Sequence, residues 1–132
     1  MNGSIKIPSD MSNLYRVEKL IDTIAENLGI RDDLYGNISV CLVEAVSNSI
    51  QHGNKYDVTK IVLLEYQTTG DGLDFIITDE GIGFDLNSVP DPTLPENVEN
   101  IKGRGIFLIT HLSDSINFEN KGSKITISFS LK

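Results

Sequence analysis

One long amphipathic segment limits the fold more than any other feature of this chain. Residues 32–52 place apolar side chains at helical spacing, and Gly53 follows where a helix would end. On a helical wheel the apolar positions cover more than half of the circumference, so we expect a buried helix. The remaining polar stripe faces either solvent or a wet pocket. Its members are Asn37, Glu44, Ser47, Asn48, Gln51 and His52.

The composition of this polar stripe favours a pocket. Stripes that face only solvent usually carry several Lys, Arg and Glu, whereas Glu44 is the single charged member here. Glu44 is a candidate proton acceptor, and the amide oxygen of Asn48 is a hard ligand of the kind that Mg²⁺ takes. Taken alone, these two residues also fit an ordinary helix edge. His52 also fits a cap of the helix C-terminus, and Cys41, at the border of the stripe, fits the core.

The helix ends are predicted from capping residues. Ser9 or Ser12 is expected to cap a first helix that runs to about Leu28, before a glycine. Asp32 or Asp33 is expected to cap the second helix. A third, short helix is expected over 105–112.

Alternating apolar residues and turn residues predict five strands. They are expected at 3–8, 59–67, 72–79, about 114–119 and 123–131. The element order is then β-α-α-β-β-loop-α-β-β. This order predicts a single α+β domain over 1–132, a two-layer sandwich in which helices cover one face of a mixed, mostly antiparallel sheet.

Composition and charge exclude several classes of function. With a net charge of −8 and only eleven basic residues, the chain is a poor candidate for nucleic-acid binding. It has no apolar run near the roughly 20 residues of a membrane span, and its N-terminus does not resemble a signal peptide. One cysteine and two distant histidines disfavour a zinc site and fit a reducing compartment. We therefore expect a cytoplasmic protein without a membrane or nucleic-acid partner.

Two glycine-bearing motifs suggest a ligand. Asp79 ends a strand and opens DEGIGF, in which Gly81 and Gly83 allow close backbone approach to a flat ligand. A carboxylate at this turn is able to accept a hydrogen bond from the exocyclic amine of adenine, although Asp is also an ordinary turn residue. The terminal strand opens with Gly122 and Ser123, whose hydroxyl is a candidate neighbour of Asp79.

The third motif follows the long segment 81–103, which contains three prolines and no sustained period. A loop of this length inside a compact domain is usually functional or disordered. Gly103, Arg104 and Gly105 stand where it meets the third helix. Free N–H groups at a helix start bind anions, and Arg104 is able to pair with a phosphate. A hinge for the loop is an equally good interpretation of the two glycines.

Together, VEAVSNSIQHGN, TDEGIGFD, VPDPTLPENVENIKGRGIFLI and GSKITISF resemble the GHKL ATPase superfamily. They are most similar to its anti-sigma-factor serine kinase branch, the RsbW and SpoIIAB type. The resemblance covers about residues 5–130 and implies a Bergerat fold that binds ATP and Mg²⁺. It also implies transfer of the γ-phosphate to a serine of a small STAS-domain antagonist, with a sigma factor or another client held by the kinase. It further implies a homodimer.

Carried over by position, the resemblance gives each motif a role. Glu44 would be the general base, and Asn48 the Mg²⁺ ligand. Asp79 would bind adenine, with Ser123 beside it. Gly81 and Gly83 would line the wall beside the base. Gly103 and Gly105 would anchor an ATP lid at about 84–102. The roles of Arg104 and His52 at the nucleotide stay open.

The leading hypothesis is therefore an Mg²⁺-dependent serine protein kinase in a partner switch. One alternative is a nucleotide-gated module that sequesters a protein without phosphorylating it, although a pure switch has no need of a base at Glu44. A second is a detached ATPase domain of a histidine kinase. Nothing in the sequence supplies the helix pair that would carry a phosphoacceptor histidine.

Overall fold

In the part of the chain that the structure describes, the sheet has five strands, all paired antiparallel. The computed structural model describes residues 1–81 and 101–132, and of residues 101–104 and 121 it describes only the backbone. The spatial order is β1-β2-β3-β5-β4, so β1 and β4 form the edges. The strands are β1 (Asn2–Pro8), β2 (Ile61–Thr69), β3 (Gly72–Thr78), β4 (Ser115–Glu119) and β5 (Lys124–Ser130).

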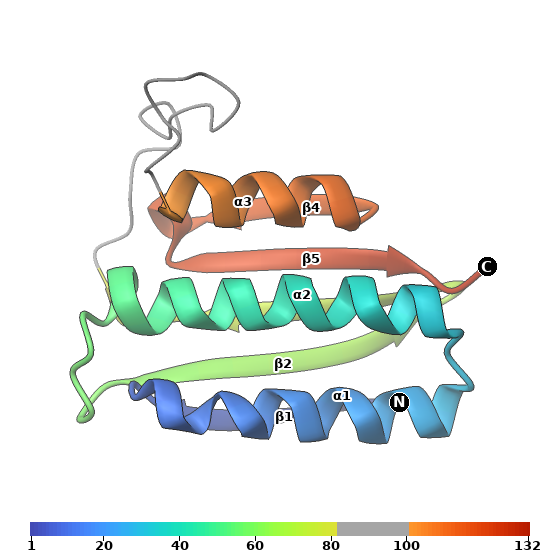
Figure 1. The fold of residues 1–132 in the computed structure, drawn as a ribbon, viewed down its shortest axis with the longest axis horizontal. Helices are drawn as coiled ribbons and strands as arrows, with labels where there is room; N and C mark the ends of the chain where they lie inside the picture. Colours follow the sequence, from blue (N-terminus) through green and yellow to red (C-terminus); the bar gives the residue numbers. More distant parts are fainter. Residues whose placement is uncertain (82–100) are drawn as a thin grey trace.

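Three helices cover one face of this sheet (Figure 1). They are α1 (Leu14–Leu28), α2 (Asp32–Asn48) and α3 (Ile101–Leu112). The central helix α2 contacts both of the others. Short turns extend the helices or join strands: η1 (Met11–Asn13), the π-helical turn η2 (Ser49–Gly53) and η5 (Asn120–Gly122).

The predicted α+β class, order of helices and strands and two-layer arrangement are confirmed. The sheet was expected to be mixed, but all its described strands pair antiparallel. The predicted long loop lies mostly outside the described residues.

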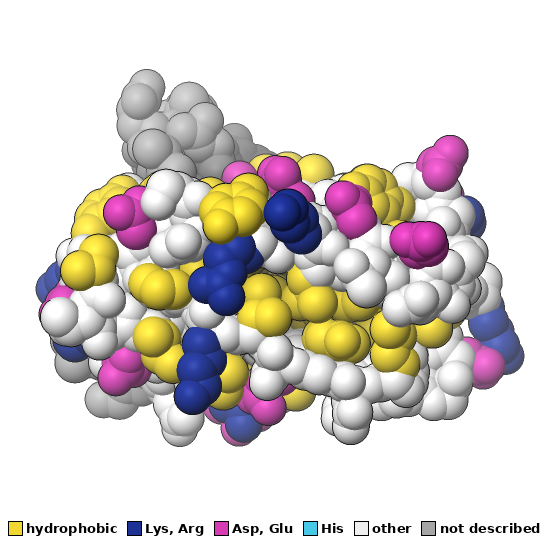
Figure 2. Space-filling model, turned by 90° about the horizontal axis from the view of Figure 1, so that it is seen from below, with side chains coloured by type: hydrophobic (Ala, Val, Ile, Leu, Met, Phe, Trp, Pro, Cys, Tyr) yellow, Lys and Arg dark blue, Asp and Glu magenta, His cyan; other side chains and the backbone are white. Residues whose placement is uncertain are grey.

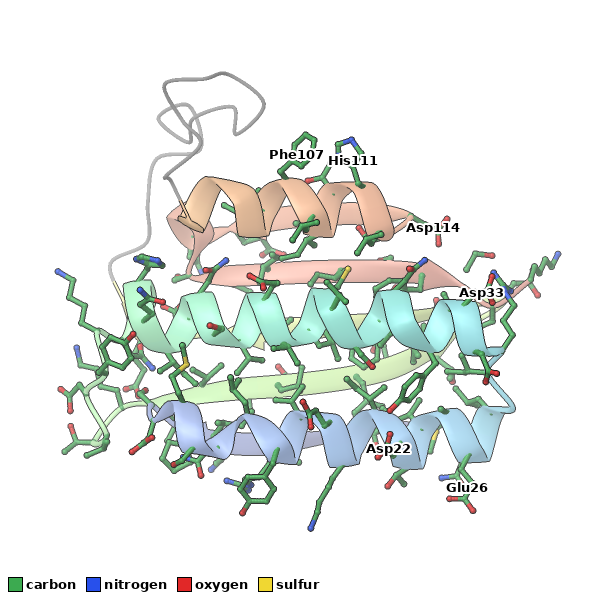
Figure 3. The ribbon with its side chains drawn as sticks, viewed as in Figure 1. Asp22, Glu26, Asp33, Phe107, His111 and Asp114 are labelled. Atoms are coloured by element: carbon green, nitrogen blue, oxygen red, sulfur yellow. The ribbon has the colours of Figure 1, made fainter. Side chains whose placement is uncertain are left out.

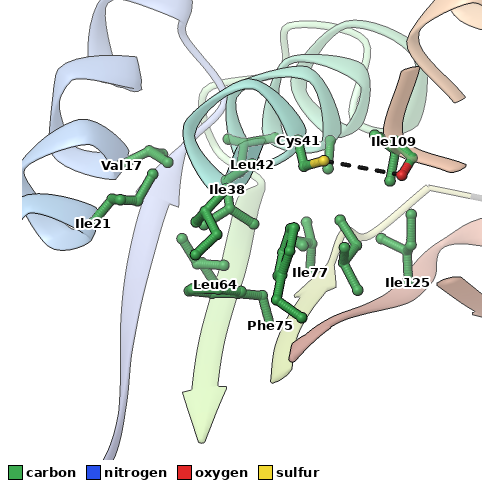
Figure 4. Close-up of a cluster of buried hydrophobic side chains, with 14 of the residues drawn as sticks. Val17, Ile21, Ile38, Cys41, Leu42, Leu64, Phe75, Ile77, Ile109 and Ile125 are labelled. Carbon is green, nitrogen blue, oxygen red and sulfur yellow. Dashed lines mark hydrogen bonds between the residues drawn. The ribbon is translucent and has the colours of Figure 1, made fainter. Parts of the chain in front are cut away.

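The core lies between α2 and the sheet (Figure 4). Along β3, alternate residues Leu73, Phe75 and Ile77 are buried, as a strand with one covered face requires. Phe75 meets Phe129 of β5 edge to face, with ring centroids 6.1 Å apart. Cys41 is fully buried in this cluster, which confirms it as a core residue, and burial raises the pKa of its thiol to about 12.

The predicted caps of the first two helices are wrong. The N-cap of α1 is Asn13, whose side chain makes no cap bond. The carboxylate of Asp10 caps the preceding turn η1 instead, by accepting from the Ser12 N–H at 2.9 Å. The Ser9 hydroxyl is buried and donates to the Lys60 carbonyl at 2.7 Å. Arg31 occupies the N-cap of α2, and the two aspartates that follow lie in its first turn, where their charge complements the helix dipole.

Two helix boundaries also differ from the prediction. Helix α2 stops at Asn48 instead of about His52, because the chain widens into η2, where the Asn54 N–H bonds to the Ser49 carbonyl at 2.8 Å. Helix α3 begins at Ile101 instead of Gly105. The two glycines 103 and 105 thus lie inside a helix, which their propensity disfavours. Packing of α3 on α2 outweighs that cost.

The edge formed by α1 and β1 carries a hydrophobic band crossed by basic side chains (Figure 2). A shallow pocket on this edge is lined by Ile5, Tyr15, Arg16, Lys19, Leu20 and Thr23. The predicted homodimer stays a prediction. In the ranges 1–81 and 101–132, every helix is too short or too polar to span a bilayer.

Candidate nucleotide site

A pocket opens beside the C-terminal end of α2, between that helix, α3 and the ends of three strands. The space between its walls, together with the open solvent at its mouth, is about 470 Å³. Its walls are largely apolar, with a few polar groups, which is the usual composition of a small-molecule site. The lining residues are Ala45, Asn48, Ser49, His52, Gly53, Asp79, Ile106, Ile109, Phe118, Gly122 and Ile125.

Glu44 and Asn48 converge on the first turns of α3. A Cβ built on Gly105 would lie 3.1 Å from Glu44 Oε2 and 3.0 Å from Asn48 Nδ2. The buried backbone of Gly105 therefore lies close to both side chains, and a residue with a Cβ would require them to shift by a few tenths of an ångström. Two residues one helical turn apart on α2 thus meet one point of α3, next to a pocket that Asn48 lines.

Backbone contacts between glycines and Asp79 build the opposite wall. A Cβ on Gly53 would lie 2.5 Å from Cγ and Oδ2 of Asp79, and a Cβ on Gly81 would lie 2.4 Å from the Gly53 carbonyl oxygen. Only glycine fits at these two positions without a shift of the neighbouring atoms. The end of η2 and the turn after β3 are therefore packed backbone to backbone.

Hydrogen bonds fix the orientation of Asp79. Its N–H donates to the Ser123 carbonyl at 2.8 Å, and its Oδ1 accepts the Gly81 N–H at 2.8 Å. The Ser123 hydroxyl donates to the Asn120 carbonyl at 3.0 Å. Ser123 thus lies beside Asp79 through its backbone carbonyl, while its hydroxyl bonds to Asn120. A role of its hydroxyl toward a ligand stays a prediction.

The π-helical turn η2 sets the position of His52. In a regular α-helix each residue is rotated by 100° about the axis. The wider π-helical turn η2 changes that rotation, and so the direction in which His52 projects. His52 lines the pocket and its Nε2 is shielded from solvent. Such turns occur often at functional sites. The other histidine, His111, stacks on Phe107 with centroids 4.0 Å apart, and both side chains point away from α2 (Figure 3).

The structure brings together most of the predicted residues that it describes. Asn48, His52 and Asp79 line the pocket, and Glu44 lies beside it across Gly105. Gly81 packs against Gly53, behind the pocket wall that carries Asp79. The backbone of Gly103 and Arg104 lies in α3. Gly83 and the predicted lid up to residue 100 lie outside the described residues.

Sequence reasoning missed several residues around the pocket. Ser49 and Gly53 line it, and the buried Asn54 joins the segments behind it. The motif VEAVSNSIQHGN contains all three, but helical periodicity gives them no role. The apolar lining from α3 and the last two strands was also missed, because only the tertiary fold gathers it.

The side-chain oxygens of Asn48 and Glu44 suit a metal ion that is held mainly by the phosphates of a nucleotide. Among residues 1–81 and 101–132, no three or more His, Cys, Asp and Glu side chains cluster tightly enough to hold an ion. Mg²⁺ is commonly bound by one or two protein oxygens together with nucleotide phosphates. Asn48, with Glu44 close by over the bare backbone of Gly105, fits that requirement.

This arrangement of strands, helices and pocket defines a GHKL-type ATPase domain. The chain belongs to the histidine kinase-like ATPase domain family, which matches residues 7–129. It is 28% identical over 123 residues to the serine-protein kinase RsbW of Bacillus cereus strain Q1, covering 85% of this chain and 73% of that protein. The serine-protein kinase RsbW of Bacillus thuringiensis strain Al Hakam is 27% identical over the same shares.

A solved structure supports the fold independently. The histidine kinase domain of the blue-light activated histidine kinase EL346 from Erythrobacter litoralis aligns with 95% of this chain at a TM-score of 0.55 and 21% identity. This chain spans 62% of that solved chain. At this identity the match shows the shared fold alone.

Proposed function

We propose that this protein is an Mg²⁺-dependent, ATP-binding serine protein kinase that acts in a partner switch. The observation that carries the proposal is the meeting of Glu44 and Asn48 over Gly105 at the edge of the pocket. A binding module needs a nucleotide pocket but no carboxylate at its phosphate end. The relatives named serine-protein kinase RsbW support the same activity.

The two ends of the pocket suit the two ends of ATP. Asp79 is held by its own turn and by the Gly53 backbone, so its carboxylate is positioned to accept a hydrogen bond from the adenine amine. The apolar lining suits the faces of the base. Asn48 would hold Mg²⁺ and thereby neutralise phosphate charge, and the backbone of Gly105 in α3 lies close to the same side chain.

Glu44 would act as the general base of the transfer. It would accept the proton of the attacking serine hydroxyl as that oxygen bonds to the γ-phosphorus and the bond to the β–γ bridging oxygen breaks. The products would be a phosphoserine and ADP. The substrate would be a small STAS-domain antagonist, and the client a sigma factor or another sequestered protein.

Label transfer from ATP tests the proposal. The protein is incubated with γ-labelled ATP, Mg²⁺ and STAS-domain proteins of the same genome, beside three variants. Glu44→Ala is expected to keep its ADP affinity and to lose about 10²–10⁴-fold in transfer. Asn48→Ala is expected to lose the Mg²⁺-dependent part of ATP binding. Glu26→Ala, an exposed glutamate on α1, is the matched control and should resemble the wild type (Figure 3).

The possible results separate the alternatives. Transfer at full rate by Glu44→Ala would overturn the assignment of the base. Nucleotide binding without transfer to any STAS-domain protein would favour the sequestering module. Absence of ATP and ADP binding by the wild type would overturn the proposed function as a whole.

A further inference from the structure

We infer that Asn54 is a positioning residue, which holds the Asp79 turn against the end of η2 and thereby sets the base-binding wall of the pocket. The inference rests on the proposed function and adds to it a residue outside the pocket lining. Asn54 is 2% exposed, so its polar atoms depend on protein partners. It follows Gly53 directly and ends the π-helical turn through its N–H bond to the Ser49 carbonyl.

The side chain of Asn54 joins three segments that are distant in sequence. Its Nδ2 donates to Ser9 Oγ at 2.9 Å and to the Ile61 carbonyl at 3.0 Å. Its Oδ1 accepts the Glu80 N–H at 2.8 Å. The ends of β1 and η2, the start of β2 and the turn after β3 therefore meet at one amide group.

The neighbouring bonds leave this amide only one orientation. The Ser9 hydroxyl gives its proton to the Lys60 carbonyl, so its oxygen is free to accept from Asn54. The Ile61 carbonyl is an acceptor and the Glu80 N–H is a donor, so exchanging Oδ1 and Nδ2 would break both of those bonds, and Ser9 could then bond to Asn54 only by giving up its own bond to Lys60. Both amide protons and the amide oxygen are thus used.

The held turn is the one that carries Asp79. Glu80, whose N–H bonds to Asn54, lies between Asp79 and Gly81, and both of these contact Gly53. The Glu80 carboxylate adds a second connection, since its Oε2 accepts the Ile61 N–H at 2.7 Å. Losing Asn54 would free the turn from η2, and the Asp79 carboxylate would lose its fixed distance from Gly53. The consequence should be weaker and less selective recognition of the base.

The test compares ADP with GDP, because a carboxylate that accepts from the adenine amine meets a carbonyl oxygen in guanine. Dissociation constants are measured by calorimetry at a temperature where all variants are folded. Asn54→Ala is expected to raise the Kd for ADP about five- to tenfold. This is the effect of losing one hydrogen bond to the ligand, the bond between the Asp79 carboxylate and the adenine amine. The Kd for GDP should change less, so discrimination between the bases falls. Turnover at saturating ATP should stay within about twofold, because the phosphate end is unchanged.

Ser9→Ala separates positioning from stability. It removes the bonds to Lys60 and to Asn54 Nδ2 but keeps the bond from the Glu80 N–H. We expect its melting temperature to fall while its ADP-to-GDP ratio stays that of the wild type. If Asn54→Ala does not fold, Asn54→Ser replaces it, because it keeps a polar group at this buried position but lacks the carboxamide that joins Ser9, Ile61 and Glu80, and it should raise the Kd for ADP about threefold.

Two results would overturn the inference. One is a Kd for ADP within twofold of the wild type in Asn54→Ala, or in Asn54→Ser where that variant stands in. The other is an equal rise for ADP and GDP, which would indicate general damage to the pocket. A wild-type protein that binds neither nucleotide would instead refute the proposed function.

Discussion

The two ends of the helix–sheet sandwich contain parts of the same elements but are held by different interactions. At the end that carries the α1–α2 connection and the C-terminus, on the right in Figure 1, the contacts are exposed. Lys132 pairs with Asp71 at 2.8 Å, and the Arg31 guanidinium donates to the Lys132 carbonyl at 3.2 Å. Gly29 ends α1 in the left-handed conformation, and a Cβ there would meet no described atom within 4 Å.

At the pocket end the contacts are buried and crowded. Ser9 and Asn54 are almost inaccessible, and Gly53 and Gly81 are in close contact with their neighbours. Exposed ion pairs tolerate change because water replaces either partner. Buried amides and crowded glycines do not, since each substitution leaves an unsatisfied group or a clash. The comparison indicates that the fold fixes its geometry most strictly around the candidate nucleotide pocket.

Gly53→Ala should have the largest effect. Its Cβ would lie 2.5 Å from the Asp79 carboxylate, so Asp79 or the end of η2 must move. We expect a loss of about 2 kcal/mol in the free energy of unfolding, measured with urea, and an ADP affinity more than about tenfold weaker.

Gly36→Ala is the matched control for that substitution. Gly36 lies on the exposed side of α2, where a Cβ would meet no described atom within 4 Å. The variant should gain about 0.5–1 kcal/mol from helix propensity and bind ADP as the wild type does. Unchanged ADP binding by Gly53→Ala would contradict the difference between the two ends.

The same contrast explains what the sequence could predict. Periodicity and turn residues predicted the strands, the helices and the stop at Gly29, because those depend on neighbours in sequence. The width of η2 and the start of α3 were missed. The side chain of Asn54 finds its partners at positions 9, 61 and 80, and Gly105 lies inside a helix, close to Glu44 and Asn48. The site residues that share one helix face, such as Glu44 and Asn48, were predicted from the sequence. The residues that take part only because several segments meet, such as Asn54, were missed.

Cys41 tests the core that both ends share. Burial raises the pKa of its thiol from an ordinary 9.0 to about 12, so the unfolded chain releases this proton first. The stability that this difference supplies is fully present below pH 9.0 and is lost as the pH rises toward 12. Between about pH 8 and about pH 10, wild type should lose about 1.4 kcal/mol more than Cys41→Ala in urea unfolding. Equal losses would show that the thiol reaches solvent in the folded state.

Gly29→Ala should cost about 1 kcal/mol in the free energy of unfolding, because its φ of 64° is strained for a residue with a Cβ. This end lies away from the pocket, so the Kd for ADP should not change. Gly29→Asn is the control, since Asn tolerates this conformation and should recover part of the loss. A change in ADP affinity would mean that the two ends are coupled, and the contrast between them would fail.

Lys132→Ala should have the smallest effect. The side chains of Lys132 and Asp71 are 74% and 65% exposed, so water screens their attraction and each keeps its solvation when the other is removed. We expect a change of at most about 0.5 kcal/mol in urea unfolding, with Asp71→Ala as the reciprocal control. High salt should reduce even this difference, because screening acts on exposed pairs first. A loss above about 1 kcal/mol that persists in high salt would mean that this end, too, depends on a fixed contact. Exposure would then not predict which end of the sandwich tolerates substitution.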